Sequence, residues 1–456
     1  MKILFVRPKP SPETIGLQHM MIVEPLELEI LSALKRPEDE SFLADLIIEK
    51  KSLEHFLTLV KPDILCITGY ITHVRIIVDY CRTAKKIHPA LATVVGGVHC
   101  EVCPEDFDDP SVDFRVVRNP AIVFTQLLSF IAKETDLPPG ILTPGMIMNE
   151  ASLPAFDFSI PFPDRSITEK YRHKYFYIFH NKVALIKTSF GCPYSCTFCF
   201  CRVITRNSYW QRPMDEVIRE LKDIKEENVY IVDDDFLTDR KRLYLFVSEL
   251  RRNGIRKYFL VYGRADFIAH NPDLIAELHS VGLHTVIVGF ESFSENELKN
   301  YNKKTTLEDN KKAMAILNEN HIDCYATIIL SPDWDGDDFN QMVNKVKELG
   351  IQYVNLQPLT PLPKTGISYH EDDLLIKNHE YEKWDLAHVI VKPTRMTVSD
   401  YYRHILKAYY EILFRRTVLW SHFRRYSIGM LWKMLLGSQK VAYQYKKKLR
   451  EEHDYA

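Results

Sequence analysis

Four cysteines fall within ten positions of the stretch SFGCPYSCTFCFCR, residues 189–202, and their spacing could hold a metal centre. Cys192, Cys196 and Cys199 follow the pattern C-x3-C-x2-C just after an expected strand. Zinc usually takes four protein ligands as two separated pairs, and no second pair stands at a suitable distance. Cys201 is too near Cys199 for both thiols to chelate one ion easily. Three thiolates on an iron–sulfur cluster leave one iron open, so the pattern favours a cluster over zinc, a disulfide or a run of buried thiols.

The composition is that of a globular protein in a reducing compartment. The chain has 456 residues, of which 46% are hydrophobic and 26% charged, which allows two or three domains. The net charge of −2 gives no pull toward nucleic acid, and we expect no nucleic-acid partner. We expect neither a secretory leader nor a spanning helix, because the apolar runs are too short. The sequence thus predicts a cytoplasmic protein, in which disulfides are rare.

The elements of residues 1–135 alternate between strands and helices, which predicts a doubly wound α/β domain. In such a sheet ligands bind outside the carboxyl ends of the strands. The expected strands are 2–6, 63–70, 92–99 and 112–117, the helices are 25–36, 74–87 and 121–134, and the ligand-facing loops are 7–20, 68–73, 96–100 and 118–121.

Residues 181–365 form a second series of six βα units, which predicts a partial (β/α)6 barrel with its active residues at the carboxyl ends of the strands. Its first strand carries the cysteines. Residues 136–180 are expected to be an ordered connector, and 366–456 a helical cap. The expected strands are 183–189, 228–233, 257–262, 284–290, 323–330 and 352–357, with helices at 213–226, 241–253, 272–281, 307–320 and 337–349.

The segment GCPYSCTFC resembles the cluster loop of the radical S-adenosylmethionine (SAM) enzymes. The resemblance implies that Cys192, Cys196 and Cys199 bind a [4Fe–4S] cluster whose open iron chelates SAM, and that electron transfer yields a 5′-deoxyadenosyl radical. It also implies an external electron donor such as flavodoxin or ferredoxin. Cys201 is expected to be a spectator thiol.

The resemblance continues at the other strand ends, where it implies further SAM-binding residues. Asp233, Asp234 and Asp235 in YIVDDDFLTD would accept hydrogen bonds from the ammonium or hydroxyl groups of the cofactor. The other expected contacts are Arg264 in YGRADFI, near the SAM carboxylate, and Gly289 and Glu291 in VGFES. The segment PLTPLPKTG resembles the family's barrel-closing segment, although Lys364 stands where glycine is usual.

The first domain resembles the cobalamin-binding domain of class B radical SAM proteins, on VEPLELEILSALKR, KPDILCITGY and VVGGVHCEVCPE. The resemblance implies cobalamin contacts from Thr68, Gly69, Tyr70, Gly96, Gly97 and His99. The Asp-x-His-x-x-Gly motif that supplies a lower axial histidine elsewhere is absent, and His19 in GLQHMM does not match it. RNPA (118–121) also replaces the acidic segment common in this domain. We therefore expect a corrinoid without a protein imidazole on cobalt.

Several alternatives stay open at this stage. Methylthiotransferases share the cluster loop, and Cys66, Cys100 and Cys103 could hold their second cluster. A class B cyclase or oxidase would use the same cofactors without methyl transfer, and a corrinoid- or cluster-based sensor would not be an enzyme. The favoured interpretation is a radical SAM C-methyltransferase that uses methylcobalamin to methylate an unactivated carbon.

The tail is basic and aromatic, with twelve Lys or Arg and one acidic residue, Glu411, in residues 401–450. An amphipathic helix is expected there. We expect it to cover the open barrel end and to help form the substrate pocket, with its charges outward. The alternatives are that it lies on an anionic membrane surface or binds nucleic acid. The layout and YIFHNKVALIKTSFGCPYSC resemble the hopanoid C-methylases, which implies a small-molecule or lipid-like substrate and peripheral membrane contact.

Overall fold

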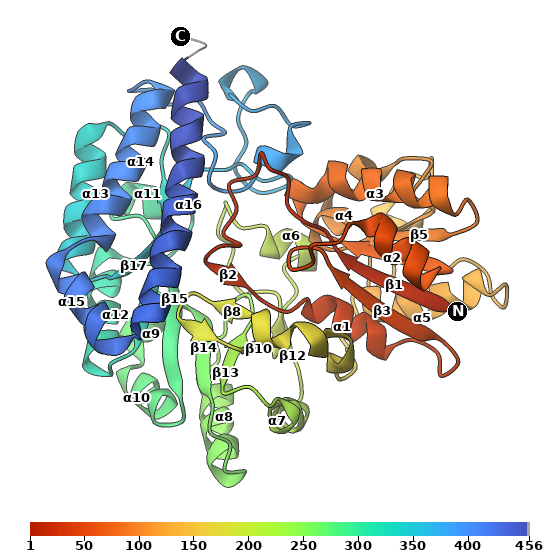
Figure 1. Ribbon diagram of the computed structural model, residues 1–456. Coiled ribbons are helices and arrows are strands. Elements are labelled where there is room, and N and C mark those ends of the chain that lie inside the picture. The colour runs from red at the N-terminus through yellow and green to blue at the C-terminus, as the bar shows by residue number, and fades with distance from the viewer. Residues whose placement is uncertain (454–456) are drawn as a thin grey trace.

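A computed structural model describes residues 1–453, and its two large sheets lie in the two halves of the chain (Figure 1). The first sheet has the order β3-β1-β4-β5-β6-β7, parallel except for the last pair. The order reverses between β1 and β4, which places the ligand crevice of a doubly wound sheet at their carboxyl ends. The strands are β1 (Lys2–Arg7), β3 (Glu40–Asp45), β4 (Ile64–Thr68), β5 (Ala92–Gly96), β6 (Phe114–Val116) and β7 (Ile141–Leu142).

Helices cover both faces of this sheet, and a separate apolar core lies on each face. The doubly wound fold expected from the sequence is therefore confirmed. The strand β3 and the helix α2 were not predicted, because a short run bracketed by Glu40 and Asp45 shows no regular alternation. The helices are α1 (Leu26–Ala33), α2 (Leu53–Val60), α3 (Val74–Ile87), α4 (Val98–Val102) and α5 (Pro120–Ile131).

The second sheet is fully parallel and runs in chain order, as a partial (β/α)6 barrel requires. Its strands are β10 (Val183–Ile186), β13 (Asn228–Ile231), β14 (Tyr258–Arg264), β15 (Leu283–Glu291), β16 (Asp323–Leu330) and β17 (Tyr353–Pro358). The outer helices are α7 (Met214–Asp223), α8 (Arg240–Arg252), α10 (Pro272–Ser280), α12 (Leu307–Glu319) and α13 (Gly336–Glu348). The barrel interior is aromatic, with Tyr230, Tyr325 and Tyr353 among its buried residues.

A buried group of charges joins the two halves through the connector. Arg165, in a 3-10 segment (Arg165–Lys174), lies 2.8 Å from Glu220 of α7 and pairs with Glu24 before α1. Arg172 lies 2.8 Å from the same Glu24. Burial, and next the charge of Glu24, raise the pKa of Glu29 to about 9. The connector is therefore tied to both domains, and β7 lies inside it. The expected boundaries at 135, 180 and 365 stay predictions.

The tail becomes helical only at Val398, which corrects the expected start of the helical cap at residue 366. Residues 366–397 contain two short 3-10 turns and a single antiparallel bridge. They form a small core that contacts Ile71, in the loop after β4. The last three residues of the expected cap, 454–456, lie outside the described residues. The helices are α14 (Val398–Leu413), α15 (Arg416–Arg425) and α16 (Ile428–His453).

These helices do not close the barrel mouth, so the expectation that residues 401–450 cover it is wrong. α14 packs on α13 and β17 as the sixth outer helix. Arg425 of α15 pairs with Asp323, the first residue of β16, so α15 lies at the amino end of the barrel. α16 then runs beside the barrel, as Figure 1 shows. No helix in residues 1–453 is long and apolar enough to span a membrane.

Candidate functional site

The cysteine loop is framed by the antiparallel pair β11 (Ser189–Phe190) and β12 (Trp210–Gln211). Gly191 opens it with φ +76°, where a Cβ atom would meet the Ser208 carbonyl oxygen at 1.9 Å. Burial, then the charge of Asp235, raise the pKa of the Cys192 thiol to about 12, and the charges of Cys196 and Cys199 act in the same direction. The three thiols therefore lie close enough to sense one another, as a shared cluster requires.

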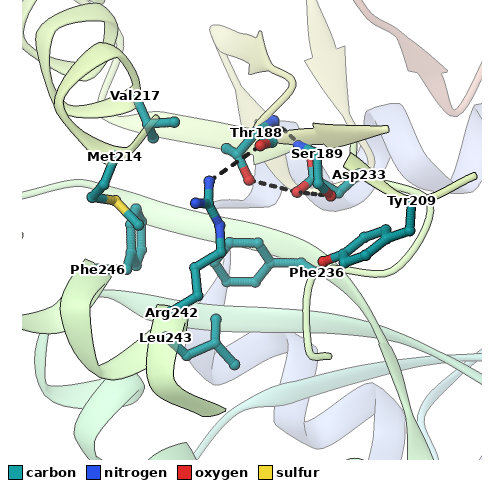
Figure 2. A pocket seen from close by; sticks show the side chains of 10 residues that line it. All are labelled: Thr188, Ser189, Tyr209, Met214, Val217, Asp233, Phe236, Arg242, Leu243 and Phe246. Carbon is teal, nitrogen blue, oxygen red and sulfur yellow. Dashed lines mark hydrogen bonds between the residues drawn. The ribbon is translucent and has the colours of Figure 1, made fainter. Parts of the chain in front are cut away.

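Asp233 lies against the start of this loop, next to Thr188 and Ser189 (Figure 2). Its carboxylate accepts hydrogen bonds from the backbone N–H groups of Thr188 and Ser189, at 2.6 and 3.0 Å, and from both hydroxyl groups. The adjoining cavity, lined by Arg242 and Phe246 among others, holds about 10 Å³, room for one water at most. All the contacts of Asp233 thus serve to anchor the loop, and it is not placed to contact SAM as the sequence predicts.

Asp234 and Asp235 point elsewhere. Asp234 accepts a hydrogen bond from the Gly191 N–H at 2.9 Å. Asp235 is 3% exposed, and among residues 1–453 neither of its carboxylate oxygens has a hydrogen bond of ordinary geometry. Burial raises the pKa of Asp235 to about 8, against the opposing charges of Arg264 and Lys303 and a weaker contact with the Leu237 N–H. A buried acceptor without a donor beside Cys192 fits the ammonium group of a bound SAM.

Arg264 ends β14 beside the cluster loop. It pairs with Asp266 at 2.9 Å, lies 3.7 Å from the Cys196 sulfur and stacks 3.8 Å from the centre of the Tyr194 ring. The charges of Asp266 and Cys196 keep the pKa of this guanidinium raised in spite of its burial. Arg264 therefore places a positive charge next to a cluster thiolate.

Gly289 and Glu291 end β15 and meet a lysine that the sequence did not indicate. Glu291 accepts a hydrogen bond from the Lys303 ammonium at 2.8 Å, and the two side chains are almost fully buried. A Cβ atom on Gly289 would lie 2.3 Å from this carboxylate and 2.8 Å from the ammonium. Gly289 thus makes room for the ion pair. The Glu291 carboxylate can bind a ligand only as half of that pair.

The glycines of the first domain bring two loops together at the switch point. Gly97 has φ +97°, and a Cβ atom there would lie 2.6 Å from the Thr68 hydroxyl oxygen and 3.1 Å from the Gly69 nitrogen. Gly96 has no comparable clash. Tyr70, next along the β4 loop, is 60% exposed. The loops after β4 and β5 therefore pack backbone to backbone, which leaves their outer surface open to a bulky ligand.

His99 lies in α4, directly after the Gly97 turn, and is 5% exposed. Its Nε2 lies 2.7 Å from the Asp106 carboxylate, and its ring contacts Phe107 and Tyr381 edge-on. His19 lies near Lys440, and burial and then this charge lower its pKa. Asp106 holds the His99 ring, and both the expected cobalamin contact of His99 and the expected lack of a protein imidazole on cobalt stay predictions.

The second-cluster alternative fails on geometry. Cys66 belongs to the core on one face of the first sheet, whereas Cys100 belongs to the core on the other face. Burial raises the pKa of both thiols and that of Cys103. These cysteines cannot share a cluster as placed.

The two sites meet between the domains, where α6 (Cys201–Thr205) contacts α4 (Figure 1). Burial by the surrounding protein raises the pKa of Tyr70 to about 12, although 60% of the residue is exposed. The charges of Glu27, Tyr262 and Cys201 act in the same direction. Tyr70 therefore lies where the two domains meet, near Tyr262 and Cys201. Lys364, with φ +60° where the family has glycine, donates a hydrogen bond to the Val102 carbonyl of α4.

Sequence reasoning missed Lys303, Tyr194, Asp266 and Tyr262. Lys303 follows the short helix α11 (Glu295–Asn300), and no motif marks it. Tyr194 lies within the cluster loop, and Tyr262 and Asp266 lie within the segment YGRADFI, so position in a motif was the available signal for these three.

Comparison with known proteins agrees with this architecture. A model of the B12 binding domain matches residues 17–128, and a model of the Radical SAM superfamily matches residues 186–346. The hopanoid C-3 methylase of Methylococcus capsulatus is 26% identical over 92% of this chain and 82% of its own length. The anaerobic magnesium-protoporphyrin IX monomethyl ester cyclase of Rubrivivax gelatinosus is 24% identical over 82% of this chain and 71% of its own.

A solved structure shares the fold. The cobalamin-dependent SAM radical enzyme OxsB, with aqua-cobalamin and SAM bound, superposes with a TM-score of 0.61 at 19% identity over 75% of this chain. The match spans about half, 51%, of the OxsB chain. Both halves of the chain therefore have the architecture that their motifs predicted.

Proposed function

The chain belongs to the cobalamin-dependent radical SAM enzymes, and we propose that within this family it transfers a methyl group to an unactivated carbon of a lipid-like substrate. Its cofactors are a [4Fe–4S] cluster, SAM and cobalamin. When bound, they supply a carbon-centred radical and a methyl donor. The observation that carries the proposal is the contact of α6 with α4, which brings the cluster loop against the glycine turn of the cobalamin domain.

In this proposal the chain's own residues bind and orient the cofactors. Cys192, Cys196 and Cys199 hold the cluster. Asp235 accepts a hydrogen bond from the SAM ammonium, because its buried carboxylate oxygens have no hydrogen-bond donor within the described chain. Arg264 and the Glu291–Lys303 pair contribute charges for the SAM carboxylate and hydroxyl groups. Asp233 and Asp234 hold the loop in place.

On the cobalamin side, Gly96, Gly97, Thr68, Gly69 and Tyr70 would form the floor that faces the corrin ring. Residues 366–397 pack over these loops and would keep water from a radical site. Reduction of the cluster requires a one-electron donor from outside the chain, such as flavodoxin or ferredoxin.

The lipid-like substrate is supported by the similarity to the hopanoid C-3 methylase and by aromatic side chains where the two domains meet. Tyr70 and Tyr262 are 60% and 38% exposed, and the Tyr230 ring centre lies 5.9 Å from that of Tyr262. Aromatic rings bury large apolar area and so suit a ring-rich hydrocarbon.

The test is anaerobic incubation of the reduced protein with lipid extract and SAM labelled in its methyl group. We expect a labelled product, with release of both S-adenosylhomocysteine and 5′-deoxyadenosine. An unlabelled, oxidised or cyclised product with 5′-deoxyadenosine alone would contradict methyl transfer. It would favour the second candidate, a radical cyclase, which the similarity to the magnesium-protoporphyrin cyclase supports.

A further inference from the structure

The surface formed by α15 and the exposed side of α16 carries an unusual concentration of large apolar side chains. Of the 21 such residues that are exposed in the described chain, eight lie between Tyr410 and Tyr443. We define the elbow face by six of them: Trp420, Phe423, Ile428, Trp432, Leu436 and Tyr443, which are 43–81% exposed.

These side chains share one surface because of their spacing. Ile428, Trp432 and Leu436 follow one another at four-residue intervals on α16, so they lie along one side of the helix. Trp420 and Phe423 are three apart on α15, which contacts α16. The elbow face thus gathers six exposed apolar side chains on two helices that contact each other, whereas an ordinary surface carries such residues singly.

Basic side chains border the stripe. Arg416 and Arg424 are exposed on α15, and Lys440 and Lys446 are exposed on the same side of α16 as Trp432. The one acidic residue of 401–450, Glu411, lies 2.6 Å from Lys347 and is neutralised by it. Within residues 401–450 the face therefore combines apolar side chains with positive ones.

The elbow is held firmly to the barrel, so the face is presented by a rigid support. Arg425 forms two hydrogen bonds with Asp323, and Tyr426 stacks on Phe179 with ring centres 3.9 Å apart. Farther along α16, Tyr445 is buried against Tyr402. The inner side chains of these helices pack in the core, whereas the outer apolar side chains are exposed to solvent.

We propose that the elbow face docks on an anionic lipid bilayer. Tryptophan and tyrosine favour the boundary between headgroups and acyl chains, and lysine and arginine bind anionic headgroups. A second copy of this chain is a poorer partner, because two such faces would bring like charges together. This inference does not depend on methyl transfer, although it suits an enzyme whose substrate lies in a membrane.

The test is co-sedimentation of the full-length holoenzyme with phosphatidylcholine vesicles, with and without phosphatidylglycerol. We expect sedimentation with the anionic vesicles only. Each basic residue near an anionic surface is worth about a fivefold change in affinity, so Lys440→Gln with Lys446→Gln should weaken binding by roughly 25-fold. The matched control is Lys50→Gln with Lys51→Gln, on the exposed turn before α2.

A second pair tests the apolar contribution. Trp420→Ser with Trp432→Ser should abolish sedimentation. Leu59→Ser with Ile147→Ser should not, because these residues are at least as exposed but lie in the first domain and the connector. Iron and corrinoid content, measured on every variant, reports folding separately from binding.

Three outcomes would overturn the proposal. The wild-type protein does not sediment with anionic vesicles; the control pairs weaken binding as much as the elbow pairs; or light scattering shows a dimer that Trp420→Ser with Trp432→Ser dissociates. Binding to a single-stranded oligonucleotide in place of vesicles would equally reject a membrane partner. None of these results bears on the product of the methyl-transfer assay, so the two proposals fail independently.

Discussion

Asp233 and Asp235 are two residues apart, yet the structure gives them opposite environments, and this difference can be measured. Asp233 is 1% exposed and accepts four hydrogen bonds at the start of the cluster loop. In Asp233→Ala the N–H groups of Thr188 and Ser189 lose their acceptor. A buried donor left unsatisfied costs about 1–3 kcal/mol, so the two together cost about 2–6 kcal/mol. The two hydroxyl groups can rotate toward other acceptors and add little.

A loss of that size is a large part of the roughly 5–15 kcal/mol that holds a typical domain folded. It corresponds to a fall in melting temperature on the order of 10 °C. We expect Asp233→Ala to show this fall and to lose iron, because Thr188 and Ser189 lead directly into the cluster loop. Asp233→Asn keeps one acceptor oxygen and should lie between Asp233→Ala and the wild type.

Asp235→Asn should behave in the opposite way. It replaces a buried carboxyl group that lacks a partner, so the melting temperature should stay the same or rise. SAM binding should be lost with iron content unchanged. The assay is thermal unfolding of anaerobically purified protein, iron analysis and equilibrium dialysis with SAM. If Asp235→Asn destabilises the protein as much as Asp233→Ala does, or if Asp233→Ala is stable and simply fails to bind SAM, the assignment of the two roles is wrong.

Three further predictions concern the two cofactors. Replacing any of the three cluster cysteines by Ala should abolish the cluster absorbance and SAM cleavage, whereas Cys201→Ala should retain both; loss of the cluster in Cys201→Ala alone would refute the ligand assignment. Gly97→Ala should reduce cobalamin content, because its Cβ would meet the Thr68 hydroxyl at 2.6 Å on a backbone with φ +97°; normal corrinoid absorbance would contradict this. Electron paramagnetic resonance of the cob(II)alamin form should show no protein nitrogen on cobalt, and splitting that disappears in His19→Ala or His99→Ala would disprove it.

Much of the architecture could be predicted because it follows from patterns within short stretches of sequence, such as apolar runs and residue spacing. The six barrel strands are short apolar runs between helical periods, and the cysteine spacing is a property of one loop. The roles of the aspartates could not be predicted in the same way. Which of three consecutive carboxylates turns toward Thr188 depends on the backbone after β13, and adjacent residues show no period there.

Other features depend on contacts that are distant in sequence. Lys303 pairs with Glu291 from a loop beyond a short helix, and no motif marks it. The amphipathic pattern of residues 401–450 correctly indicated helices, yet it cannot say which end of the barrel they cover. That choice rests on Arg425 meeting Asp323, about a hundred residues away.

The buried charges around Arg165 and Arg172 limit the ways in which a substrate can reach the cofactor sites between the domains. Swinging the two domains apart would remove from the buried Glu24 carboxylate the hydrogen bond that it accepts from the Leu185 N–H at 2.5 Å, and would separate Arg165 from either Glu24 or Glu220, which is unfavourable. The spacing of the two cofactor sites is therefore set when the chain folds. Substrate entry and product release would instead require residues 366–397 to move; their regular structure is limited to two 3-10 turns and a bridge. Loops move in nanoseconds to microseconds, and domains more slowly, so opening this segment need not limit turnover.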